Sequence, residues 1–165
     1  MDRNELERII REKLQEILGA EKDDTFMVEA SGRHVHLTKE HVEALFGKGY
    51  ELTPAKDLSQ PGQFAAKERV RVIGPKGEFS NVAILGPCRN FSQVELSLTD
   101  CREIGVKGVI RESGKIEGTP GILIGVGDKY VHLDKGVIVA KRHIHMTRED
   151  AERFSVKDGE TVKVK

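Results

Sequence analysis

The sequence of 165 residues predicts a mainly β protein with a few short helices. Most of the chain after residue 60 divides into runs rich in β-branched residues, and these runs are too short to be ordinary helices. Turn residues separate the runs, and the chain contains 17 glycines. No long helical pattern alternates with the runs. The sequence therefore favours a closed β-barrel or a sandwich over an alternating α/β fold.

The first 20 residues predict an amphipathic helix. Charged residues fill one face, and six apolar residues recur at spacings of three and four on the other; they are Leu6, Ile9, Ile10, Leu14, Ile17 and Leu18. The polar segment 20–25 (AEKDDT) then predicts a linker. Residues 1–25 are thus expected to form a helix and linker, and the helix packs either on its own domain or on another protein.

The rest of the chain predicts short elements in a regular succession. Residues 26–37 are expected to be extended, and a helix follows that Thr38 caps and Gly47 closes. Two prolines and a Pro-Gly turn predict a loop over 51–66. Strands are expected at 69–74, 79–86, 92–100, 107–114, 121–126, 130–133 and 136–146. A second helix begins at Thr147. Asp158-Gly159 predicts a hairpin turn between two last strands.

Composition and charge exclude several classes of function. The 27 basic and 27 acidic residues balance, so neither nucleic acid nor an anionic membrane is an expected partner. No apolar run is long enough to span a bilayer, and the first residues lack the apolar core of a secretory signal. We expect a cytoplasmic protein. Cys88 and Cys101 are then expected to be free thiols that serve packing.

A phrase with two histidines occurs twice. The segment RHVHLTKE at 33–40 returns as RHIHMTRE at 142–149. Side chains alternate along a strand, so His34 and His36 are expected on one face, and His143 and His145 likewise. A single pair would be explained as the polar face of a half-exposed strand. Two copies in the same local frame favour a metal site that joins four imidazoles, a ligand type that suits zinc.

Two further residues are candidates for this site. Carboxylates often join histidines around catalytic zinc, and Glu95 shares a predicted strand face with Gln93 and Ser97. The alternative is that Glu95 is an ordinary solvent-facing residue. Arg89 follows a Gly-Pro turn just before that strand, where a guanidinium could clamp a phosphate or carboxylate. The alternative for Arg89 is a surface charge. His41 and His132 have no partner in the pattern and are expected to be structural or exposed.

Five motifs together resemble one known family. They are SGRHVHLT, LSQPGQFA, GPCRNFSQVELSLTD, IRESG and GVIVAKRHIHM, and they occur in the expected order over about residues 27–155. This set resembles the phosphate propanoyltransferases of bacterial microcompartments. The resemblance implies an enzyme that transfers a short acyl group, propanoyl or acetyl, between coenzyme A and phosphate, by direct attack of phosphate on the thioester.

The resemblance also implies a fold and a set of site residues. The family has two small β-barrels with two metal ions, usually zinc, between them. Here the first barrel would comprise residues 26–32 and 141–165, and the second residues 33–140. The ligands implied are His34, His36, Glu95, His143 and His145. The resemblance further places phosphate on Arg89, and coenzyme A near Ser31 and Lys56.

Some features depart from the family pattern. Ala83 stands where members commonly have an arginine near coenzyme A. Members also continue beyond the last residue for several strands, which include another histidine ligand, so the first barrel is expected to be incomplete and turnover reduced. Short N-terminal helices in this family commonly act as encapsulation signals. Residues 1–20 are therefore candidates to dock to shell or other cargo proteins inside a microcompartment, and a homo-oligomer is a further possible assembly.

Two other functions fit part of the pattern. A hydrolase that uses zinc-bound water would explain the histidines but would leave LSQPGQF and Arg89 without a role. A non-catalytic metal-binding or microcompartment-cargo module would fit an incomplete barrel, although it would not explain why the ligands are retained. Release of coenzyme A from propanoyl-CoA in the presence of phosphate distinguishes all three functions.

Overall fold

The computed structural model describes residues 5, 9, 13 and 31–164. In chain order the elements are β1 (His34–His36), α2 (Lys39–Phe46), β2 (Pro54–Asp57), β3 (Phe64–Ile73), β4 (Glu78–Gly86), β5 (Gln93–Glu95), α3 (Leu98–Ile104), β6 (Ile110–Arg111), β7 (Ile122–Val126), β8 (Lys129–Leu133), β9 (Val137–Ala140) and α4 (Arg148–Arg153). The helix predicted over residues 1–20 lies almost wholly outside the described residues. Of its apolar stripe, only Ile9 is described, as a helical residue.

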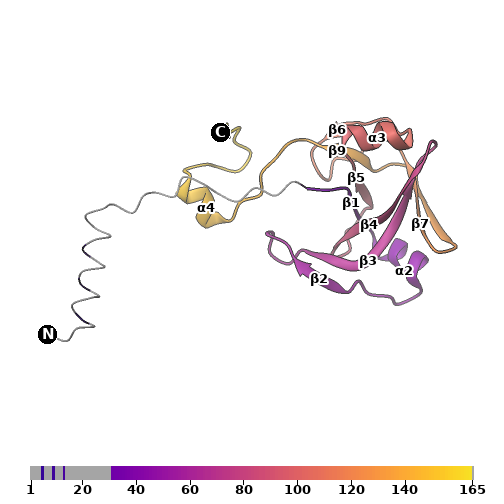
Figure 1. Cartoon of the computed structure of the whole chain (residues 1–165), viewed down its shortest axis with the longest axis horizontal. Helices are drawn as coiled ribbons and strands as arrows, with labels where there is room; N and C mark the ends of the chain where they lie inside the picture. Colours follow the sequence, from indigo (N-terminus) through magenta and orange to yellow (C-terminus); the bar gives the residue numbers. More distant parts are fainter. Residues whose placement is uncertain (1–4, 6–8, 10–12, 14–30, 165) are drawn as a thin grey trace.

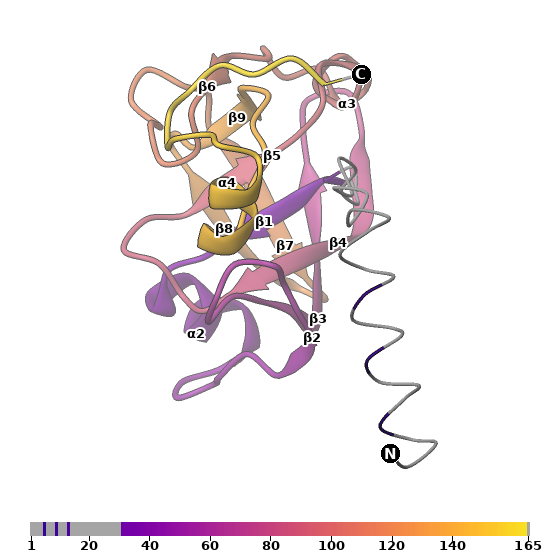
Figure 2. The same cartoon turned by 90° about the vertical axis from the view of Figure 1, so that its left-hand side faces the viewer.

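The described strands form a single mixed sheet that curls on itself (Figures 1 and 2). Its order is β6-β9-β5-β1-β4-β3-β7-β8, and β2 pairs with β3 beside this path. Strand β1 pairs parallel with β4, and β9 pairs parallel with both β5 and β6. The remaining pairs are antiparallel. The mainly β prediction is confirmed, in the form of one curled sheet with few helices.

Strand β1 lies in the interior of this sheet. It has β4 on one side and β5 on the other, and all three of its residues are buried. Its apolar residue Val35 joins the core, whose largest fully buried side chains include Leu37, Leu45, Ile84, Ile104, Ile124 and Ile138. Its two histidines face away from that core yet are also covered. They are therefore not the solvent-facing side of a half-exposed strand.

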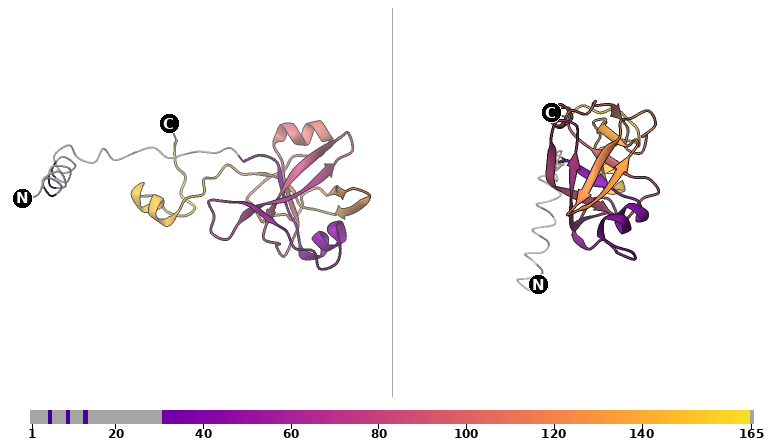
Figure 3. Two further views of the ribbon diagram at one scale, coloured as in Figure 1. Left: turned by 60° about the horizontal axis from the view of Figure 1, so that its bottom comes forward. Right: turned by 90° about the vertical axis from the view of Figure 1, so that its right-hand side faces the viewer.

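Two short helices lie at opposite ends of the curled sheet (Figure 3). Helix α2 begins as predicted, because the Thr38 side chain accepts a hydrogen bond from the His41 backbone N–H. Helix α3 replaces the second half of a predicted strand. Ser97 and Asp100 form a capping box there, each side chain accepting from the other's backbone N–H. The strand predicted over 92–100 therefore ends at Glu95.

The segment expected to be a loop contains strand β2 and the start of β3. Strand β2 lies at a sheet edge, and its four residues are exposed. An edge strand tolerates Pro54, since a proline lacks an N–H to donate. The register shifts between Pro54 and Lys56, which marks a bulge. The prediction of a loop over 51–66 is wrong for these residues, because proline does not exclude a bulged edge strand.

Residues 141–164 stand apart from the sheet (Figures 1 and 3). They contain α4, which Thr147 caps as predicted, but no strand and no buried residue. The predicted strand over 136–146 ends at Ala140, and Asp158-Gly159 forms a turn without flanking strands. The division into two barrels stays a prediction, and residues 26–30 of the first one lie outside the described part. No described helix is both long and apolar enough to cross a lipid bilayer.

Candidate functional site

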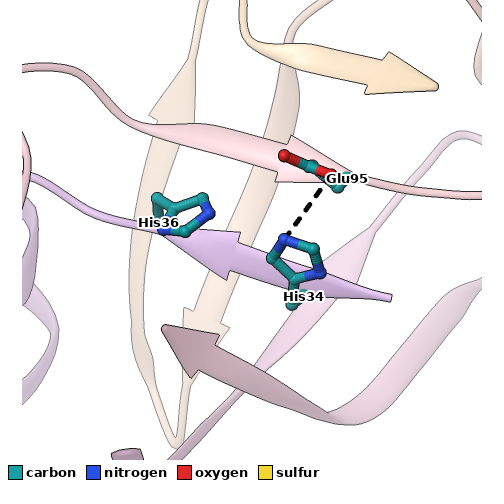
Figure 4. Close-up of side chains that lie close together, drawn as sticks. All are labelled: His34, His36 and Glu95. Atoms are coloured by element: carbon teal, nitrogen blue, oxygen red, sulfur yellow. Dashed lines mark ion pairs between the residues drawn. The ribbon is translucent and has the colours of Figure 1, made fainter. Parts of the chain in front are cut away.

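Three polar side chains meet in the buried middle of the sheet. They are His34 and His36 of β1 and Glu95 of β5, and their ligand atoms lie within 4.8 Å of one another (Figure 4). The register of β1 against β5 places His34 directly opposite Glu95 and His36 opposite Gln93. His34 Nε2 is 3.6 Å from Glu95 Oε2. The cluster therefore follows from the pairing of two strands far apart in the sequence.

Backbone carbonyls fix which ring nitrogen of each histidine is free. His34 Nδ1 lies 2.9 Å from the Gly32 carbonyl oxygen, and His36 Nδ1 lies 3.2 Å from the Leu85 carbonyl oxygen. A carbonyl can only accept, so each Nδ1 must bear the proton and donate it. In the neutral form of each ring, Nε2 then has the lone pair. This is the arrangement in which a histidine ligates a metal through Nε2 while its other nitrogen is held by a carbonyl.

The Glu95 carboxylate is oriented by side chains of its own neighbourhood. Its Oε1 accepts hydrogen bonds from Gln93 Nε2 at 2.7 Å and from Ser113 Oγ at 3.0 Å. Burial alone would raise the pKa of Glu95. The bond and charge of His34, together with the Ser113 bond, outweigh burial and lower the pKa to about 2. Glu95 is therefore an anion at neutral pH, as a metal ligand needs to be.

Arg89 lies close enough to His36 to influence its ionisation. Burial, followed by the positive charge of Arg89 and that of His34, lowers the pKa of His36 to about 4, so the ring is neutral at pH 7. The Arg89 backbone N–H donates to the Leu37 carbonyl at 2.9 Å, which ties the arginine to the end of β1. Its side chain is half-buried, and burial lowers its pKa. Among the described residues its guanidinium has no hydrogen-bond or ion-pair partner, so its donors are available to an anion.

The second histidine pair repeats the local geometry of the first. His143 Nδ1 lies 2.7 Å from the Lys141 carbonyl, as His34 Nδ1 does from Gly32. The rings of His143 and His145 are perpendicular with centroids 4.7 Å apart, and those of His34 and His36 are perpendicular at 5.1 Å. His143 Nε2 and His145 Nε2 lie 3.0 Å apart.

The structure does not bring this second pair into the His34, His36 and Glu95 cluster. No ligand atom of His143 or His145 belongs to the described group within 4.8 Å. Both side chains are exposed. Partial burial, the charge of His143 and that of Arg89 nonetheless lower the pKa of His145, and the charge of Glu95 opposes them. His145 thus lies within electrostatic reach of both Glu95 and Arg89.

The other candidate residues lie at different distances from the cluster. Ser31 is exposed, and its Oγ is 3.4 Å from His34 Nδ1, a weak contact. Lys56 is an exposed residue of edge strand β2. Ala83 of β4 pairs directly with His34. Cys101 is buried in the core, whereas Cys88 is exposed beside Arg89.

The family to which the chain belongs is shown by comparison with known proteins. The sequence profile described as phosphate propanoyltransferase matches residues 27–165. The chain belongs to the phosphate propanoyltransferase family. A relative of that name from Leptotrichia buccalis is 94% identical over 165 residues, which are 100% of this chain and 78% of the relative. One from Sebaldella termitidis is 74% identical over the same shares, and one from Clostridioides difficile is 55% identical over 97% and 77%. As its name states, the family consists of acyltransferases.

Among the residues of this phosphate propanoyltransferase-family chain, sequence reasoning missed the surroundings of Glu95. Gln93 was expected beside Glu95 only as a residue of the same strand face. The structure adds that its amide is fully buried and bonded to Glu95, Ser113 and Gly114. The alternation along β5 could have indicated the bond between Gln93 and Glu95. No local sequence pattern indicates Ser113, because it reaches the site only through the pairing of β6 with β9 and of β9 with β5.

The residues at this site fit a divalent metal ion. Two imidazoles oriented through Nδ1 and one carboxylate make a nitrogen and oxygen donor set that suits zinc and similar borderline ions. Three protein ligands also leave room for a substrate atom or for further ligands. The half-buried Arg89 beside them adds an anion-binding group. The arrangement can thus bring a metal and an anionic substrate together.

Proposed function

We propose that this chain transfers a propanoyl or acetyl group between coenzyme A and inorganic phosphate with the help of bound zinc. The observation that supports this most is the buried cluster of His34, His36 and Glu95 beside Arg89, whose guanidinium has no hydrogen-bond or ion-pair partner in the described part of the chain. The family's name supplies the reaction. We further propose that His143 and His145 complete the metal ligands, in the family's arrangement of two ions, because their local geometry matches that of the first pair.

A bound divalent ion would polarise the thioester carbonyl and stabilise the negative charge that develops on its oxygen. Arg89 binds phosphate through two parallel N–H donors and holds it for attack. Partial burial strengthens this ion pair, since the surroundings screen the charges less than water does. The carbonyls of Gly32 and Leu85 hold the Nδ1 atoms of His34 and His36, and so orient the two rings.

Direct attack by phosphate needs no nucleophile from the protein. A phosphate oxygen forms a bond to the carbonyl carbon, and the carbon–sulfur bond breaks to release coenzyme A as a thiolate. The two cysteines are poorly suited to a covalent route. Cys101 lies in the core, and burial raises the pKa of Cys88, so this thiol is protonated at neutral pH. Coenzyme A binding is proposed to involve Ser31, close to His34, and Lys56.

The same proposal extends to architecture and partners. We propose that residues 33–140 form one barrel unit, and that 141–165 together with 26–32 belong to a second. The lack of buried residues in the described segment 141–164 supports a unit with its own packing needs.

We also propose location inside a bacterial microcompartment, with residues 1–20 docking to shell or cargo proteins. Deletion of residues 1–24 should then abolish co-localisation of a fused fluorescent protein with shell while activity persists.

The test of the reaction is a coenzyme A release assay with propanoyl-CoA. We expect release that requires phosphate, that a chelator abolishes and that added zinc restores. Acyl phosphate should form in equal amount to the released thiol. Release that proceeds at the same rate without phosphate would instead indicate a hydrolase. A zinc-loaded chain that binds propanoyl-CoA but releases no thiol would overturn catalysis and leave a binding module.

A further inference from the structure

We infer that Gln93 and Ser113 are positioning residues. They hydrogen-bond to one carboxylate oxygen of Glu95 and leave the other oxygen free to bind the metal. This inference rests on the proposed metal site. Oε1 of Glu95 accepts from both Gln93 Nε2 and Ser113 Oγ, at 2.7 and 3.0 Å. Oε2 accepts from neither and faces His34 Nε2 at 3.6 Å. The carboxylate is thereby set to bind a metal through a single oxygen.

The orientation of the Gln93 amide follows from its hydrogen bonds. The Gly114 backbone N–H donates to Gln93 Oε1 at 2.8 Å. A backbone N–H cannot accept, so the oxygen of the amide must face Gly114 and its NH2 group must face Glu95. The same NH2 group donates to Ser113 Oγ at 3.0 Å. Both N–H donors of Gln93 are therefore used within the site.

The burial of Gln93 indicates that these bonds serve a purpose. Its side chain is fully buried in β5, opposite His36 of β1. A buried amide costs stability unless its donors and acceptor are satisfied, and an apolar residue of similar volume would fill the space more simply. What the amide adds is a donor that fixes Glu95. Partners of this kind typically change metal affinity by about 10- to 100-fold when they are removed.

The segment that supplies Ser113 and Gly114 is itself anchored. It follows β6, in which Arg111 pairs with Ala140 of β9. The Lys141 backbone N–H donates to the Arg111 carbonyl at 2.7 Å, and the Lys141 carbonyl in turn accepts from His143 Nδ1. The segment that orients Glu95 thus also contacts Lys141, the residue just before the second histidine motif.

The experiment measures binding of Co²⁺ alone to the metal-free full chain, followed by the visible absorption of the bound ion. Wild type should bind with saturable absorption. Gln93→Met keeps the side-chain volume without a donor and should raise the Kd about 10- to 100-fold. Ser113→Ala should raise it about 10-fold, while Ser113→Thr, which keeps the hydroxyl, should restore affinity to near wild type. At saturating Co²⁺ the absorption bands of Gln93→Met should also shift, because Glu95 changes its binding mode.

Thr119→Val is the matched control, since Thr119 is also a buried polar residue, bonded to Ile116 and Gly136 outside the site. It should lower the melting temperature yet leave the Kd for Co²⁺ unchanged. Equal Kd values for wild type, Gln93→Met and Ser113→Ala would overturn the inference. So would an equal loss of affinity in Thr119→Val, which would indicate general destabilisation. If wild type itself shows no saturable binding, the proposed metal site fails and the inference fails with it.

Discussion

The two histidine motifs have the same local geometry in very different surroundings. In each, the first histidine bonds the carbonyl two residues earlier, the rings are perpendicular, and a threonine caps the helix that follows. The first motif lies inside the sheet, and His36 is only 3% exposed. The second lies outside any strand, with both rings exposed. The local geometry therefore depends on the motif, whereas the burial of the rings depends on the sheet.

This difference separates two roles that a ligand can have. His36 contributes to the packing of the sheet as well as to the proposed metal site, because it is covered by β4 and β5. His145 can contribute to the metal site without contributing to the core. Substitutions that are equivalent in the two motifs should therefore have equal effects on catalysis and unequal effects on stability.

The largest effect is expected from removing one ligand of each pair. His36→Ala and His145→Ala should each lower kcat/KM for propanoyl-CoA by at least about 1000-fold, because several kcal/mol of transition-state stabilisation is lost. Only His36→Ala should also destabilise the fold, by about 1–3 kcal/mol, since it alone leaves a buried gap. Activity assays and chemical denaturation measure the two effects. His132→Ala, an exposed histidine beside Asp134, should change neither. A stability loss in His145→Ala equal to that in His36→Ala would contradict the expectation that only His36 contributes to the packing of the fold.

The next effect concerns the pH dependence of stability in the metal-free protein. The pKa of His36 is about 4 in the folded chain against the usual 6.5, so the unfolded chain binds the proton more tightly. The contribution is fully present above pH 6.5 and is lost as pH falls toward 4, by about 3 kcal/mol in total. Denaturant unfolding at intervals between pH 7 and 4 measures it. His36→Gln should flatten this slope, whereas His145→Gln should leave most of it. An unchanged slope in His36→Gln would assign the loss to other groups.

Below that range a second group should respond. The pKa of Glu95 is about 2 against the usual 4.5, so its contribution is present above pH 4.5 and is lost between 4.5 and 2. Glu95→Gln should remove this part of the curve and leave the loss above pH 4.5 in place. A curve that keeps its full decline below pH 4.5 in Glu95→Gln would contradict this assignment.

A moderate effect is expected from replacing Arg89, which lies beside the first histidine motif. Arg89→Lys should raise the KM for phosphate roughly 10- to 100-fold, because an ammonium cannot reproduce two parallel hydrogen bonds to one anion. The melting temperature should stay near that of wild type, since the guanidinium has no partner among the described residues. Steady-state kinetics with varied phosphate test this. Arg102→Lys, at an exposed position of helix α3, is the control. An unchanged KM for phosphate would exclude Arg89 from phosphate binding.

The smallest effect is expected at Cys88. Its thiol is exposed next to Arg89, yet its raised pKa keeps it protonated at neutral pH. Cys88→Ala should therefore keep kcat within about twofold of wild type, consistent with direct attack by phosphate. Measurement of kcat with both substrates saturating decides this. A loss beyond about tenfold would indicate a covalent acyl-cysteine route.

Local signals predicted part of this fold well. Thr38 and Thr147 each cap the helix that the sequence assigns to them, because capping depends on residues only three positions apart. The strand predicted through residue 100 failed for the opposite reason. The alternation of Val94, Leu96 and Leu98 suggested a continuing strand, whereas the capping box of Ser97 and Asp100 starts a helix. Both signals were present in the sequence, and the capping signal was the stronger.

The candidate site likewise has some features that a local pattern predicts and others that depend on strand pairing. Alternation along one strand is enough to place His34 and His36 on one face. It cannot say that Glu95 lies opposite His34, because that depends on the register of β1 with β5. Ser113 depends on two further strand pairings. The convergence of His143 and His145 with the first pair stays a prediction, since it depends on how residues 141–164 pack and not on any local pattern.

Strand β1 pairs with partners that are distant in the sequence, and this affects when the site can form. His34 meets Ala83 and Glu95, and Glu95 meets Ile138. These pairs close long loops, so they are expected to form late in folding. During synthesis on a ribosome, β5 and the two strands that flank it, β1 and β9, exist together only after residue 140 has emerged. We therefore expect the proposed metal to bind firmly only after residue 140 has been synthesised, and histidines exposed earlier to bind ions only loosely.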